Sequence, residues 1–240
     1  MKSFKEIFEE LARHNDRSVI WNEWLDYAIE ANLIYNPKPK TNYHNKHETY
    51  YEMISSWINE LTKELETKPY YDMLGQFYEE LVQSRSKGKS LGQMYTPQSV
   101  SDLISELTFN EPEGVVNDPT CGSARMLLAA HVKHQGRMYC IGQDLDETSC
   151  KMAVLNFWSH GVRGSILHMD TLEGTFFKAW RVNNYLYDGL PVPHIELVSQ
   201  REAYRFIGYK VNSIDGISND NEKSIGGEYK PVGTGQTTLM

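Results

Sequence analysis

Long apolar runs and paired cysteines are both missing from this sequence of 240 residues. No stretch of about 18 consecutive apolar residues exists, and the first residues lack the apolar segment of a signal peptide. The three cysteines, Cys121, Cys140 and Cys150, form no C-x-x-C pair, and their odd number argues against a disulfide framework. We therefore expect a soluble, cytoplasmic protein with no membrane-bound part.

Basic charge is also scarce. The chain has 24 lysines and arginines against 32 aspartates and glutamates, which gives a formal net charge of -8. A protein that binds nucleic acid on its own usually has a basic face, so this balance counts against a stand-alone nucleic-acid binder. It leaves open a protein that reaches DNA through a partner.

Residues 1–90 have the apolar periodicity of helices. Ser3 and Glu6 have the spacing of a capping box, and apolar residues then recur on one face. The predicted helical stripes cover residues 4–11, 20–29, 50–65 and 73–81. We interpret this part as a helical N-terminal domain whose aromatic residues form its core, followed by a polar linker.

The pattern changes in residues 91–211, where short apolar runs alternate with helical stretches. The predicted strands are 115–116, 138–142 and 165–167, and the predicted helices are 100–107, 124–134 and 148–160. This alternation indicates βαβ units and a parallel sheet, so the predicted fold class is α/β. The run 194–198 is a candidate fourth strand, after which we expect the sheet to stop. Residues 212–240 are rich in Gly, Ser, Asn and Thr, and we expect a mobile tail there.

One strand-to-helix turn carries most of the chemical information. The block 116–124, V-N-D-P-T-C-G-S-A, lies where a ligand binds at the carboxyl edge of an open α/β sheet. Asp118, Asp144 and Asp170 each follow a predicted strand at intervals of 26 residues, so a parallel sheet would place them at one edge. Asp144 has about the spacing at which an acidic residue binds ribose hydroxyls. The alternative is an ordinary turn with helix-capping acids.

Four segments in this order resemble a known family: G-Q-M-Y-T-P at 92–97, D-P-T-C-G-S at 118–123, G-Q-D at 142–144 and D-T-L at 170–172. They are similar to segments of the N6-adenine-specific DNA methyltransferases, and most similar to those of the modification subunits of type I restriction systems. The likeness covers residues 70–172, because Tyr70–Gly75 resembles the helix that leads into this domain.

The resemblance implies a partial Rossmann-like class I methyltransferase sheet that binds S-adenosylmethionine. In the family, the first segment packs over the methionine part, the turn holds the amino-acid end, the second acid holds the ribose, and the third lies near the adenine amino group. The implied cofactor-binding residues are Tyr95, Thr96, Pro97, Asp118, Pro119, Thr120, Cys121, Gly122, Ser123, Asp144 and Asp170.

The sequence also departs from the family pattern. Ala124 and Arg125 follow the turn where the family usually has more glycine, and no N-P-P-Y or N-P-P-F motif follows Asp170. That motif holds the target amine and stacks on the flipped base. Asn184 and Tyr185 are the weak candidates for a substitute catalytic pair.

Two functions therefore stay open. One is a DNA adenine methyltransferase homologue that acts in DNA methylation or restriction-modification, with DNA reached through partner subunits or a homo-oligomer. The alternative is a catalytically inactive relative that binds or interferes with a restriction-modification complex. No metal site is predicted, since His131 and His134 lack further ligands at suitable spacing. The helix N-terminus after Cys121 would lower the pKa of its thiol, although packing is its expected role.

Overall fold

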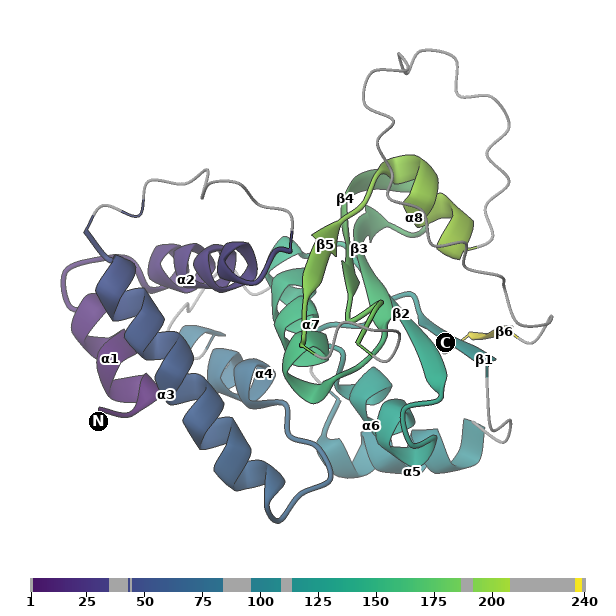
Figure 1. The fold of residues 1–240 in the computed structure, drawn as a ribbon, viewed down its shortest axis with the longest axis horizontal. Coiled ribbons are helices and arrows are strands. Elements are labelled where there is room, and N and C mark those ends of the chain that lie inside the picture. Colours follow the sequence, from purple (N-terminus) through teal and green to yellow (C-terminus); the bar gives the residue numbers. More distant parts are fainter. Residues whose placement is uncertain are drawn as a thin grey trace.

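A computed structural model describes residues 2–34, 43, 45–83, 96–108, 114–186, 192–207 and 236–238 of the chain. Its helices are α1 (Phe4–Leu11), α2 (Arg17–Ala31), α3 (His47–Leu65), α4 (Met73–Phe77), the π-helical turn η1 (Tyr78–Gln83), α5 (Gln98–Thr108), α6 (Arg125–Lys133), α7 (Glu147–His160) and α8 (Gln200–Phe206). Its strands are β1 (Gly114–Asp118), β2 (Met138–Asp144), β3 (Gly164–Asp170), β4 (Thr175–Val182), β5 (Ile195–Leu197) and β6 (Gln236–Thr238). Figure 1 shows α1, α2 and α3 grouped on one side of the sheet-containing part.

The ends of several helices follow from short side chains. Ser3 and Glu6 form the predicted capping box at the start of α1, and Asp146 accepts a hydrogen bond from Ser149 N–H at the start of α7. Gly161 ends α7 with a φ of 68°, a left-handed conformation that glycine adopts without a steric penalty. These local signals explain why the predicted helices lie close to the observed ones.

The strands form one mixed sheet with the order β5-β4-β3-β2-β1-β6. β2 pairs in parallel with β1 and β3, which confirms the predicted parallel βαβ units. β5 confirms the candidate strand at 194–198. The expectation of only four strands is wrong, because β4 and β6 are additional members of the sheet.

The sequence analysis missed β4, which returns antiparallel to β3 as a hairpin. Its two charged residues, Lys178 and Arg181, weaken the apolar pattern. Lys178 Nζ lies 4.8 Å from the centroid of the Trp180 ring, and Arg181 pairs with Glu196 of β5 at 3.1 Å. Aromatic and acidic neighbours therefore accommodate charges that are unusual in a strand.

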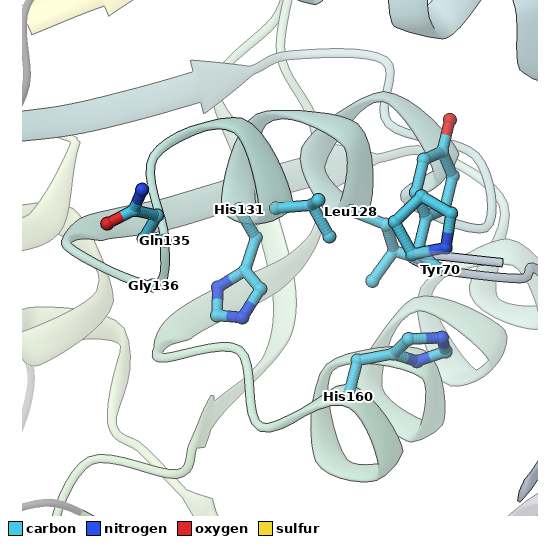
Figure 2. A pocket seen from close by; sticks show the side chains of 8 residues that line it. Tyr70, Leu128, His131, Gln135, Gly136 and His160 are labelled. Carbon is cyan, nitrogen blue, oxygen red and sulfur yellow. The ribbon is translucent and has the colours of Figure 1, made fainter. Parts of the chain in front are cut away.

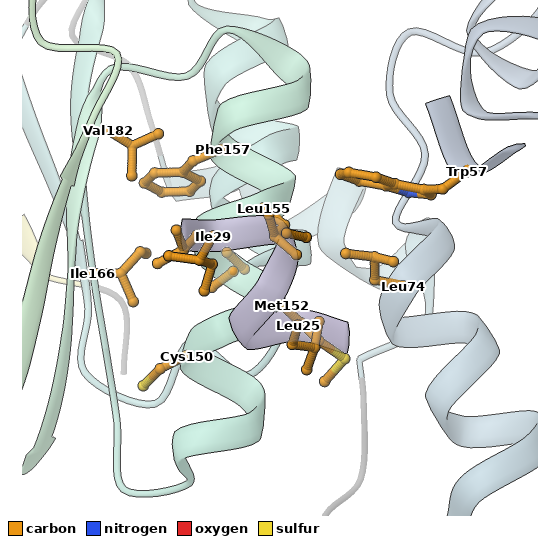
Figure 3. Close-up of a cluster of buried hydrophobic side chains, with 14 of the residues drawn as sticks. Leu25, Ile29, Trp57, Leu74, Cys150, Met152, Leu155, Phe157, Ile166 and Val182 are labelled. Atoms are coloured by element: carbon orange, nitrogen blue, oxygen red, sulfur yellow. The ribbon is translucent and has the colours of Figure 1, made fainter. Parts of the chain in front are cut away.

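Successive side chains of β2 point to opposite faces of the sheet, and each face packs in a different hydrophobic cluster. Cys140 belongs to the larger cluster, whereas Tyr139 and Ile141 belong to a smaller one with α8. The larger cluster also contains apolar side chains of α2, α3, α4 and α7, and Figure 3 shows Leu25 and Ile29 of α2 among them. The helical N-terminal part and one face of the sheet thus share a hydrophobic core.

Polar contacts tie the same parts together. Lys151 of α7 is buried and lies 2.9 Å from Asp26 of α2. Beyond α2, Ile34 N–H donates to the carbonyl of Ile195 at 3.1 Å, so this segment covers the outer edge of β5. An uncovered strand edge invites pairing with another chain, and the N-terminal part covers this one. The domain division near residue 90 stays a prediction, since residues 84–95 lie outside the described residues.

Most of the predicted C-terminal tail, residues 208–235, also lies outside the described residues. The three described residues Gln236–Thr238 form β6, which pairs in parallel with β1. The sequence analysis predicted no strand there. Within the described ranges, no helix combines the length and the low polarity that crossing a bilayer requires.

The segment after β4 provides a test of the fold. Asn183 is buried with a φ of 55°, and its amide donates to the carbonyls of Phe157 at 2.8 Å and Val162 at 3.1 Å. Its Oδ1 accepts a hydrogen bond from His194 N–H at 3.1 Å. The side chain therefore joins the ends of α7, β4 and β5.

We expect Asn183→Ala to lower the free energy of unfolding by about 2–4 kcal/mol, because it removes three buried hydrogen bonds, including those of the Val162 carbonyl and the His194 N–H. Urea denaturation measures this change. The neighbouring Asn184→Ala is the control and should change stability by less than about 0.5 kcal/mol. Equal effects of the two substitutions would contradict this role of Asn183.

Candidate functional site

The turn between β1 and α6 has a compact backbone with two residues in the left-handed region. Gly122 has a φ of 55° and Ala124 a φ of 70°. Cys121 N–H donates to the carbonyl of Gln143 at 2.8 Å, and Ala124 N–H donates to the carbonyl of Cys121 at 2.8 Å. β2 thus holds the turn from one side, and α6 begins directly after it at Arg125. The first backbone N–H groups of such a helix are suited to an anionic group.

Asp118 ends β1 and is only 4% exposed. Its Oδ1 accepts a hydrogen bond from Thr120 N–H at 3.0 Å. Burial raises the pKa of Asp118 to about 6, and the negative charge of Asp144 contributes in the same direction. A cationic ligand group would therefore relieve an unfavourable buried charge at this position.

Asp144 ends β2 and holds the turn directly. Its Oδ2 accepts a hydrogen bond from Gly122 N–H at 2.8 Å, and its Oδ1 accepts one from Asp146 N–H at 2.9 Å. Burial raises the pKa of Asp144 as well. An ionised carboxylate has about four acceptor positions, so these two hydrogen bonds leave capacity for ligand hydroxyls.

The strand register confirms that the three predicted acids lie at one edge of the sheet. Asp118 pairs with Gly142, so Asp144 lies two positions further along. Asp144 pairs with His168, so Asp170 lies two positions beyond that. Asp170 also has a structural role, because its Oδ1 accepts hydrogen bonds from the backbone N–H groups of Leu172 and Glu173 in the turn between β3 and β4.

Gly142 leaves room under the turn for the side chains of Cys121 and Ile166. A Cβ atom at Gly142 would lie 2.8 Å from Cδ1 of Ile166 and 2.9 Å from Sγ of Cys121. Cys121 is buried, and burial raises the pKa of its thiol well above the usual value. The expected lowering by the helix N-terminus is therefore wrong, whereas the expected packing role agrees with this contact.

The segment that precedes α5 lies against the same turn. The carbonyl of Thr96 accepts a hydrogen bond from Nη1 of Arg125 at 2.8 Å. The carbonyl of Pro97 accepts hydrogen bonds from Val100 and Ser101 and so starts α5. Tyr95, the remaining candidate of this segment, lies outside the described residues.

Sequence reasoning missed Asp72, a buried residue that contacts the turn from the N-terminal side. It is 3% exposed, and its carboxylate accepts hydrogen bonds from Gly75 N–H at 2.8 Å and from the Ser123 hydroxyl. Arg125 Nε donates to it at 3.0 Å, and the Asn156 amide donates at 2.7 Å. The only local signal is an Asp before a short helix, which is typical of an ordinary cap.

The two weak catalytic candidates lie elsewhere. Val182, the last residue of β4, pairs with Gly164, the first residue of β3, so Asn184 and Tyr185 follow at the opposite edge of the sheet from Asp118 and Asp144. The Tyr185 ring stacks on His194 with centroids 5.6 Å apart. This placement does not bring Asn184 and Tyr185 to the acids.

A pocket of about 160 Å³ lies between α6, α7 and the segment before α4 (Figure 2). The residues that line it are Pro69, Tyr70, Leu128, His131, Val132, Gln135, Gly136 and His160. Burial lowers the pKa of His131 to about 4. His160 uses both ring nitrogens, towards the Asn156 carbonyl and the Tyr71 N–H. Among the residues that the structure describes, no group of three potential metal ligands occurs.

Comparison with known proteins identifies a family for part of the chain. Residues 70–186 match the N-6 DNA methylase family. The type I restriction enzyme MjaVIII methylase subunit of Methanocaldococcus jannaschii is 31% identical over 114 residues, which are 46% of this chain and 20% of that protein. The MjaVII methylase subunit of the same organism is 36% identical over 119 residues, with the same coverage. The chain thus spans about a fifth of the length of these relatives.

A solved structure gives a weaker likeness. The type I restriction-modification system methyltransferase subunit from Streptococcus thermophilus aligns with a TM-score of 0.39 and 20% identity. The alignment covers 71% of this chain and 43% of the other.

The raised pKa of Asp118 predicts a pH dependence of stability. Because the pKa in the folded state is about 6 and that of an unfolded Asp is about 4, folding favours the protonated form. This contribution is complete below about pH 4 and is lost as the pH rises through about 6. Its size is on the order of 2–3 kcal/mol.

Urea denaturation of the wild type and of Asp118→Asn between pH 4 and 7 tests this prediction. The wild type should lose stability relative to the variant as the pH rises, because the amide stays neutral. Asp144 is present in both proteins, so its effect largely cancels in the difference. A wild type that gains stability relative to the variant would overturn this assignment.

Proposed function

Because residues 70–186 match the N-6 DNA methylase family, we propose that the chain binds S-adenosylmethionine at the edge formed by Asp118, the turn and Asp144. The observation that carries this proposal is the hydrogen bond from Gly122 N–H to Asp144, beside the buried Asp118. It ties the turn to the acidic end of β2, and the hydrogen bond from Thr120 N–H to Asp118 ties the same turn to the acidic end of β1.

The residues present suit this cofactor. Asp118 accepts the ammonium of the amino-acid end, and the N-terminus of α6 faces its carboxylate. Asp144 accepts the ribose hydroxyls with the acceptor positions that the backbone leaves free. A side chain at Gly142 would push against Cys121 and the turn above it, so glycine preserves the shape of the site. Thr96 and Pro97 lie beside the methionine part, with Asp170 nearer the adenine amino group.

When bound, S-adenosylmethionine supplies an electrophilic methyl group. The protein's own tasks are to bind the two charged ends of the cofactor's amino acid and to orient its ribose. Orientation of this kind is a major source of rate enhancement in a two-substrate transfer.

We expect Asp144→Ala to weaken S-adenosylmethionine binding by about 1–3 kcal/mol, the scale of a lost hydrogen bond to a charged group. The substitution removes both the ribose acceptor and the hydrogen bond to Gly122 N–H. Isothermal titration calorimetry measures the change.

Asp16→Ala is the matched control, because Asp16 caps α2 away from the site and its loss affects helix stability alone. The control should bind the cofactor like the wild type. Absence of wild-type binding at millimolar cofactor would refute the proposed function.

We further propose that the chain works with partner subunits on DNA, as a member of a restriction-modification system or as a homo-oligomer, in the cytoplasm. Its net charge of -8 gives no general attraction for phosphates, so a partner would supply the DNA affinity. The similar proteins support this proposal, since they are methylase subunits of type I restriction enzymes.

A second candidate function is a non-catalytic relative that binds or interferes with such a complex. The sequence has no N-P-P-Y or N-P-P-F motif, and Asn184 and Tyr185 follow the strand end opposite to Asp144. The two candidate residues are therefore not placed to hold a target base beside the proposed cofactor site.

We expect the isolated chain not to methylate adenine in DNA. Methyl transfer to an exocyclic amine needs fixed acceptors for its hydrogens and an aromatic residue that offsets base extrusion, which costs a few kcal/mol. The assay is transfer of tritium from labelled S-adenosylmethionine to unmethylated DNA.

Cys121→Arg serves as the background control, since the larger side chain blocks the turn. Incorporation above this background would show that the chain is catalytic. A further substitution, Tyr185→Ala, would then test whether Tyr185 contributes despite its position.

A further inference from the structure

Arg125 contacts three residues of two separate segments with the three nitrogens of its guanidinium. Nε donates to Asp72 at 3.0 Å, Nη1 donates to the carbonyl of Thr96 at 2.8 Å, and Nη2 lies 3.5 Å from Glu79. The side chain is 13% exposed. A planar guanidinium presents its donors in fixed directions, which the single ammonium of lysine does not.

The partners of Arg125 are themselves fixed. The Asp72 carboxylate caps α4 and accepts hydrogen bonds from Ser123 in the turn and from Asn156 in α7. Its position is therefore set by two helices and by the turn. Because Arg125 is bound to this immobile carboxylate, it can hold the Thr96 carbonyl in one place.

From this geometry we infer that Arg125 is a positioning residue: it holds the Thr96–Pro97 segment against the turn, over the amino-acid end of the bound cofactor. The inference rests on the proposed function and deepens it, because it names the residue that fixes the Thr96–Pro97 side of the proposed site. It concerns a residue at which this chain departs from the glycine-rich pattern of the family. Arg125 acts through Thr96 and does not itself contact the reacting atoms.

Lys133 offers a matched comparison at the other end of α6. Its Nζ donates to the carbonyls of Ser105 at 2.7 Å and Glu106 at 2.8 Å, close to the end of α5. Arg125 and Lys133 thus hold backbone carbonyls at the start and near the end of the segment 96–108, but only Arg125 lies beside the turn. Lys133→Met loosens α5 without touching the site.

The test compares Arg125→Lys, Lys133→Met and the wild type by calorimetry with two ligands. S-adenosylhomocysteine retains the amino-acid end, whereas 5′-methylthioadenosine lacks it. We expect Arg125→Lys to weaken S-adenosylhomocysteine binding at least about tenfold and to change methylthioadenosine binding less than about twofold. Lys133→Met should leave both affinities unchanged.

An equal loss for both ligands would mean that Arg125 only supports the fold, and no loss for either would mean that it does not position the segment. Both outcomes overturn the inference. If wild-type protein binds neither ligand, the proposed function fails instead.

Hydrogen exchange of the ligand-free proteins then decides the inference about Arg125 separately. Val100 and Ser101 amides, which donate to the Pro97 carbonyl, should exchange faster in Arg125→Lys than in Lys133→Met. Equal rates in the two variants would contradict the inference.

Discussion

The arrangement of the site depends on the hydrogen bonds of one buried carboxylate, that of Asp72. It accepts hydrogen bonds from the backbone of α4, from Ser123 in the turn, from Arg125 and from Asn156 of α7. A buried carboxylate without its partners would carry a large desolvation cost, so the four groups are held in one geometry. Gly75 is required beside it, since a Cβ there would lie 2.2 Å from Oδ2 of Asp72. The N-terminal helical part is therefore joined to the turn by polar contacts as well as by the shared hydrophobic core.

A second constraint comes from the carboxyl edge of the sheet, where negative charges are concentrated. Asp118 is buried and Asp144 is partly buried, and burial raises the pKa of each. Backbone N–H groups of Thr120, Gly122 and Asp146 compensate part of this cost. The remaining cost is what the proposed ligand would offset, because its ammonium and hydroxyl groups would meet carboxylates that are already in place.

The parts of the site that are local in sequence could be predicted, and the parts that are distant could not. A strand, a turn of small residues and a helix follow one another around Asp118, so periodicity and turn chemistry were sufficient there. The common edge of the three acids followed from parallel pairing alone. Asp72 could not be predicted because its side-chain partners lie 51 to 84 residues away in the sequence. β4 could not be predicted because Lys178 and Arg181 interrupt its apolar pattern. A single sequence does not indicate which distant residues will form hydrogen bonds or ion pairs with a buried charge.

The direction of each strand explains why the proposed cofactor residues lie together and why Asn184 and Tyr185 do not join them. The acidic residues and the turn lie at the ends of β1, β2 and β3. These three strands pair in parallel through two βαβ connections, so their carboxyl ends lie at one edge of the sheet. The segment after Asp170 turns back instead, and the antiparallel β4 carries the following residues to the far edge. The separation of Asn184 and Tyr185 from the acids therefore follows from the antiparallel direction of β4 in the sheet.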